Sequence, residues 1–73
     1  MNRERLLAVY PNEMLARMWA DVLEQEGVRA MIKPQQAGYG GWGHDSFVPH
    51  AVYVLEEYIE KARRIIQPSE DEV

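Results

Sequence analysis

The chain has 73 residues, no cysteine and a net charge of -4. A chain of this length forms one domain with a small core. Without cysteine it has neither disulfides nor thiolate metal sites to stabilise that core. We therefore expect a second subunit to supplement it. The acidic balance makes nucleic acid and anionic membranes poor partners. Apolar runs such as Leu6–Tyr10 are far shorter than the roughly 20 residues that span a bilayer, and no signal-peptide pattern follows Met1. The sequence therefore predicts a cytoplasmic protein.

The first third of the chain predicts a strand followed by a helix. Residues 5–10 form a predicted strand, apolar over Leu6–Tyr10, and Pro11 ends it because it has no N–H to donate. Asn12 fits the N-cap of a helix, and Gly27 fits the position just after its C-terminus, where a positive φ is needed. Between them, large apolar residues recur at helical spacing, and we expect this stripe to face the core. It consists of Leu15, Met18, Trp19, Val22 and Leu23.

Two further strands and a second helix follow. Apolar residues alternate over 28–33, which predicts a second strand at a sheet edge, ended by Pro34. Residues 51–55 are apolar on both faces, so we place this third strand in the middle of the sheet. It runs directly into an amphipathic helix over 56–66.

The predicted element order is therefore β-α-β-β-α. A right-handed crossover, with the third strand inserted between the first two, gives a three-stranded antiparallel sheet in the order 1-3-2, with both helices on one face. This is an α+β fold, a ferredoxin-like unit that lacks its fourth strand. We expect a single domain over residues 1–67 and a disordered acidic tail over 68–73.

A long loop over 35–49 contains motifs that resemble cofactor and metal sites. Gly38, Gly40 and Gly43 spell G-x-G-x-x-G, but a strand follows where a dinucleotide site needs a helix N-terminus, so we expect no cofactor. Histidines 44 and 50, with an aspartate between them, are chemically suitable zinc ligands without a metal-binding spacing, so we expect no metal. No nucleophile with an oriented base marks an enzyme.

The same loop offers a candidate ligand site. Trp42 lies between glycines, so it either folds back over the sheet together with Phe47 or anchors a partner. An alternative function is therefore a sensor that binds a small ligand under the loop. The candidate ligand-binding residues are Tyr39, Trp42, His44 and Asp45.

Two stretches of the chain have the pattern of a known family. They are Asn12 to Gly27-Val28, with Ala16 and Leu23, and, after the loop, Val52 to Ala62. This pattern, which covers nearly the whole chain, resembles small bacterial domains named putative signal-transducing proteins; the aromatic residues over 38–44 depart from it. The resemblance implies an intracellular, non-catalytic α+β domain. Our favoured prediction is a small regulatory or protein-interaction module.

The face of the sheet away from the helices predicts a homodimer. Strand alternation places Met31, Ala51 and Tyr53 on that face. The first strand adds either Leu6, Ala8 and Tyr10 or Leu7 and Val9, depending on its register. Large exposed apolar patches mark interfaces, and the free edge of the first strand offers a second route to pairing. The candidate interface residues are Tyr10, Met31 and Tyr53. A loop folded over this face would instead keep the chain monomeric.

Overall fold

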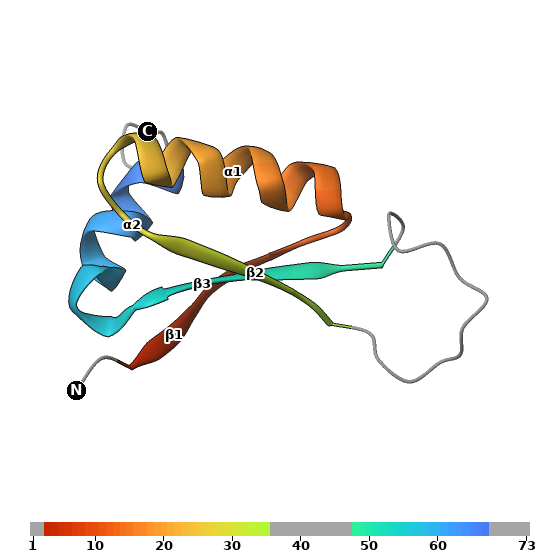
Figure 1. Ribbon diagram of the computed structural model, residues 1–73, viewed down its shortest axis with the longest axis horizontal. Coiled ribbons are helices and arrows are strands. Elements are labelled where there is room, and N and C mark those ends of the chain that lie inside the picture. Colours follow the sequence, from red (N-terminus) through yellow and green to blue (C-terminus); the bar gives the residue numbers. More distant parts are fainter. Residues whose placement is uncertain (1–2, 36–47, 68–73) are drawn as a thin grey trace.

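The computed structural model describes residues 3–35 and 48–67, and these form a three-stranded sheet with two helices. The elements are β1 (Glu4–Tyr10), α1 (Glu13–Gln25), β2 (Ala30–Pro34), β3 (His50–Leu55), the 3-10 helix η2 (Glu56–Tyr58) and α2 (Ile59–Ile66). The strands are antiparallel in the order β1-β3-β2, and both helices cover one face (Figure 1). The predicted α+β architecture is thereby confirmed, and it is consistent with a ferredoxin-like arrangement. The predicted tail over 68–73 and most of the predicted loop, residues 36–47, lie outside the described residues.

β3 is the central strand, as its apolar sequence predicted. It pairs with β1 on one side and with β2 on the other. Ala51 and Val52 point to opposite faces of the sheet, and both are fully buried. Val52 lies under the helices, whereas Ala51 is flanked on the other face by its cross-strand partners Val9 and Lys33.

α1 begins and ends at the predicted caps. The backbone N–H of Leu15 donates to the side-chain oxygen of Asn12 at 2.9 Å. At the other end, Gly27 has a φ of 87°. The N–H of Gly27 donates to the carbonyl of Glu24 at 3.0 Å, and that of Val28 donates to the carbonyl of Leu23 at 2.9 Å. These two bonds are a Schellman motif.

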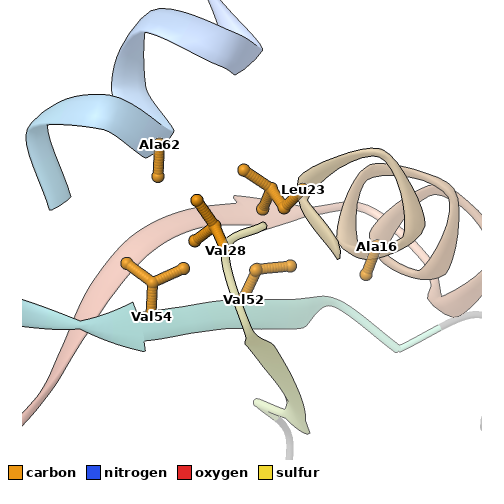
Figure 2. Close-up of a cluster of buried hydrophobic side chains, with 6 residues drawn as sticks. All are labelled: Ala16, Leu23, Val28, Val52, Val54 and Ala62. Carbon is orange, nitrogen blue, oxygen red and sulfur yellow. The ribbon is translucent and has the colours of Figure 1, made fainter. Parts of the chain in front are cut away.

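The face of α1 that meets the sheet differs from the predicted one. Of the predicted stripe only Leu23 is buried, and the other buried residues of the helix are Ala16 and Ala20. The Schellman motif explains the difference, because it brings Leu23 against Val28 and thereby fixes the rotation of the helix. The alanines, three and seven residues earlier, then face inward. The resulting core is shown in Figure 2: Ala16, Leu23, Val28, Val52, Val54 and Ala62.

A bulge in β1 breaks the simple alternation expected for the first strand. The register with β3 shifts between Leu6 and Ala8, so one extra residue is accommodated there. Leu6 and Val9 are consequently paired with Tyr53 and Ala51 and share the face away from the helices. Neither of the two residue sets expected from strict alternation is therefore realised.

Candidate functional site

The predicted ligand-binding residues Tyr39, Trp42, His44 and Asp45 lie outside the described residues, and so does Phe47. The sensor hypothesis and the alternative of a loop folded over the sheet therefore stay predictions.

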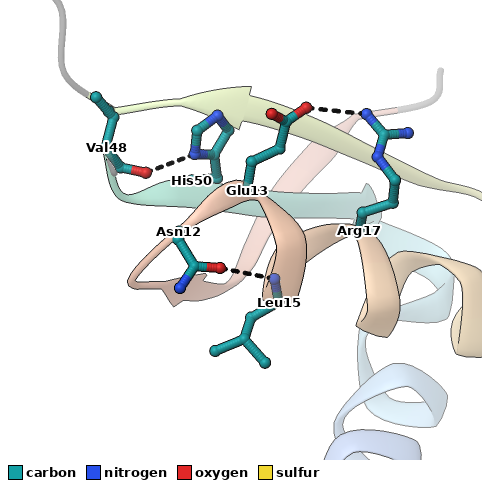
Figure 3. Close-up of polar contacts among 6 residues, drawn as sticks. All are labelled: Asn12, Glu13, Leu15, Arg17, Val48 and His50. Atoms are coloured by element: carbon teal, nitrogen blue, oxygen red, sulfur yellow. Dashed lines mark hydrogen bonds and ion pairs between the residues drawn. The ribbon is translucent and has the colours of Figure 1, made fainter. Parts of the chain in front are cut away.

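The chain on either side of that segment is held at the end of the sheet. The N–H of Gln35 donates to the carbonyl of Pro49 at 2.8 Å, which continues the pairing of β2 with β3. His50 is buried, and its Nδ1 lies 2.6 Å from the carbonyl oxygen of Val48 (Figure 3). Since a carbonyl only accepts, Nδ1 carries the proton and donates it. The imidazole thus orders the start of β3. Over residues 3–35 and 48–67, no group of three or more potential metal ligands comes together.

Five apolar residues share the face of the sheet away from the described helices, which we call the uncovered face: Leu6, Val9, Met31, Ala51 and Tyr53. Ala51 is itself buried by its neighbours. Tyr53 lies at its centre, paired with Leu6 of β1 and with Met31 of β2. Leu6 and Val9 are each 49% exposed, although both are large apolar residues. Met31 and Tyr53 are half-buried by these neighbours. The predicted positions of Met31 and Tyr53 on one face are therefore correct.

An ion pair crosses the uncovered face above Tyr53. The ammonium nitrogen of Lys33 lies 4.7 Å from the centre of the Tyr53 ring and 2.9 Å from Oε1 of Glu4. Its hydrogen bond to Glu4 and the negative charge of that carboxylate raise the pKa of Lys33. Sequence reasoning missed this arrangement, because the two residues are 29 positions apart and the bulge sets how β1 lies beside Tyr53.

Tyr10 lies on the other side of the sheet from Met31 and Tyr53. Its ring stacks on that of Trp19 in α1, with centroids 6.5 Å apart and planes inclined by 15°. It packs against the buried core, and burial raises the pKa of its hydroxyl. The bulge is the cause, because it turns the end of β1 toward the helix. Tyr10 is therefore no part of the uncovered face.

The two outer strands present different edges. β2 is short and ends in Lys33 and Pro34, which both oppose pairing with a further strand. β1 is longer and apolar, but its bulge interrupts the edge in the middle. Among the described residues, no fourth strand pairs with the outward edge of β1 or with that of β2. The uncovered face is thus better suited to docking than the edges.

Comparison with known proteins complements this geometry. Among the described residues, no helix is long and apolar enough to cross a membrane. Neither a search of curated proteins nor a search of solved structures gave a match. A family profile, however, matches residues 6–70, which include every strand and helix described above apart from the first two residues of β1. The chain therefore belongs to the family described as putative prokaryotic signal transducing protein.

Proposed function

We propose that this chain is a non-catalytic protein-interaction module in bacterial signal transduction, working in the cytoplasm as a homodimer joined through the uncovered face. The observation that carries the proposal is the exposure of Leu6 and Val9, each 49%, beside Met31 and Tyr53. Two large aliphatic residues exposed on one face of a strand are expected to be covered in the working protein. The family description supports the signalling role, and the lack of cysteine is compatible with the cytoplasm.

A second copy of the chain fits the uncovered face because the charges on it are balanced. On this face Glu4 and Lys33 neutralise each other at 2.9 Å. Arg5, which pairs with Glu56 at 3.2 Å, is opposite Val54 on the side of the helices. A twofold axis brings identical surfaces together, so a face with a net charge would repel its copy. The face instead combines an apolar centre with a neutral ion pair, the usual composition of an interface core and its rim.

The bulge in β1 favours face-to-face docking over the joining of two β1 edges. It places Leu6 and Val9 three positions apart on one face, which enlarges the apolar centre. At the same time it removes the regular run of backbone donors and acceptors that a partner strand requires.

Sedimentation equilibrium at micromolar concentration tests the proposal. We expect the wild-type chain to sediment as a dimer and the double variant Leu6→Gln/Val9→Thr to sediment as a monomer. Both side chains are half-exposed, so these substitutions spare the fold. Met14→Gln is the matched control, since Met14 is 77% exposed on the helix side. A wild-type monomer, or a dimer that the double variant leaves intact, would overturn the proposal.

A further inference from the structure

α1 has a second apolar surface besides the one that meets the sheet. We call it the α1 flank, and it consists of Met14, Leu15, Met18, Trp19 and Val22. The last four recur at i, i+3, i+4 and i+7 and so form one stripe along the helix. Among the described residues, the side chains that form or pack against the buried cluster include none of these five. Apart from Leu23, the large apolar residues of α1 therefore lie outside the buried cluster, and the other buried residues of the helix are the small Ala16 and Ala20.

The exposure of the α1 flank is unusual for a surface helix. Met14 and Met18 are two positions before and after the buried Ala16, on the side of the helix opposite the sheet, where polar residues are the rule. They are 77% and 46% exposed. Trp19 is held in place by its stacking on Tyr10. Adaptable methionines beside an ordered tryptophan are typical of a surface that binds another protein.

The charges that border the α1 flank on the helix are acidic. Asp21 follows Met18 by three residues, and Glu26, the C-cap residue just after α1, follows Val22 by four. Arg17, the base nearest in sequence, is paired with Glu13 at 3.1 Å. Glu24 lies on the other side of the helix end, where it lines a hollow of about 390 Å³ together with Arg29.

The position of these acids carries a cost for the helix. The last turn of α1 holds no basic residue, although the C-terminal end of a helix carries a partial negative charge. Acidic side chains at this end of α1 are repelled by the negative pole of the helix dipole. A positively charged group of a partner would be attracted both by these side chains and by that pole. Local sequence rules are most often broken at functional sites, so the acids indicate a positively charged partner.

We infer that the α1 flank docks a basic amphipathic helix of a partner protein. The apolar side of that helix contacts Met14, Met18 and Trp19, and its lysines or arginines lie over Asp21 and Glu26. An antiparallel orientation is favoured, because it sets the positive N-terminal end of the partner helix beside the negative end of α1. α1 lies on one side of the sheet (Figure 1), and the uncovered face is the other side, so a homodimer can bind such partners at the same time.

Calorimetric titration with a synthetic helix tests this inference. The probe is a peptide of about 18 residues, or five turns, with leucines on one face and lysines on the other. We expect it to bind wild-type protein with an affinity that falls as salt is added. The variant Met14→Gln/Met18→Gln should bind at least about tenfold more weakly, a loss of about 1.4 kcal/mol. The variant Asp21→Asn/Glu26→Gln should weaken binding and flatten its dependence on salt.

Matched controls separate docking from adsorption to an acidic protein. A peptide with glutamates in place of the lysines should not bind. The variant Glu57→Gln/Glu60→Gln removes the same number of charges from η2 and α2, so it should bind the lysine peptide like wild type. Equal weakening by this variant, or full binding by the methionine variant, would overturn the inference. Leu6→Gln/Val9→Thr should abolish the dimer and spare peptide binding, so the two proposals fail independently.

Discussion

The rotation of α1 predicts a large difference between two residues that the sequence places on the same stripe. Leu23 is fully buried between Val28 and the sheet, whereas Met18 is 46% exposed. Truncating a buried leucine removes its burial energy and leaves a cavity, at a cost of about 2–5 kcal/mol. We expect Leu23→Ala to lose this amount in urea unfolding. Met18→Ala leaves no cavity and gains helix propensity, so we expect a loss below about 1 kcal/mol.

The comparison is decisive because total stability is small. A domain of this size has a free energy of unfolding near the lower end of about 5–15 kcal/mol, so Leu23→Ala should retain no more than about 3 kcal/mol. Leu23→Met, which keeps the volume, should cost under about 1.5 kcal/mol and serves as the control for the substitution itself. Equal losses of unfolding free energy in Leu23→Ala and Met18→Ala would show that Met18 is buried against the sheet as Leu23 is. The α1 flank would then have no basis.

Three further predictions concern polar groups. Asn12→Ala should lower the free energy of unfolding by about 1 kcal/mol, or the melting temperature by about 4–8 °C, because the hydrogen bond from the Leu15 N–H to the Asn12 side chain is lost. Asn12→Ser, which can also cap the helix, should keep most of this stability. In an NMR titration the pKa of Lys33 should lie above the ordinary lysine value, and Glu4→Gln should lower it. Since the folded pKa is raised, the contribution of this pair is present below the unfolded lysine pKa and is lost as the pH rises through the folded one. An unchanged Lys33 titration in Glu4→Gln would contradict the ion pair. His50→Ala should lower the free energy of unfolding by about 1–3 kcal/mol whether or not zinc is present, because it leaves the Val48 carbonyl without its donor. A loss of stability seen only in the presence of zinc would instead indicate that His50 is a metal ligand.

Much of the fold could be predicted from local sequence rules. Asn12 and Gly27 determine where α1 begins and ends, and both act through backbone groups within a few residues of them. The apolar run over 51–55 identified the central strand, because a strand between two others is covered on both faces. The sheet order was predicted from a right-handed crossover between the first two strands with the third strand inserted between them.

The parts that escaped prediction depend on how the elements pack and pair with one another, which the apolar pattern of a single element does not determine. The apolar residues of α1 cover enough of its circumference for either of two sides to face the sheet. The contact of Leu23 with Val28 selects the side that contains Ala16 and Ala20. Nothing in the alternation of β1 marks an extra residue after Leu6, since the bulge is set by pairing with β3. Tyr10 was therefore a candidate for the face that carries Tyr53, but it lies on the helix side and stacks on Trp19.

The most direct test of the homodimer is a contact measured between its subunits. We propose an isotope-filtered nuclear Overhauser experiment on an equimolar mixture of labelled and unlabelled chains, which detects only contacts between different chains. The account predicts intermolecular signals from the methyl groups of Leu6, Val9 and Met31 to the ring of Tyr53. Intermolecular signals confined to Met14 and Met18, or none at all at millimolar concentration, would contradict the claim that the uncovered face joins two copies.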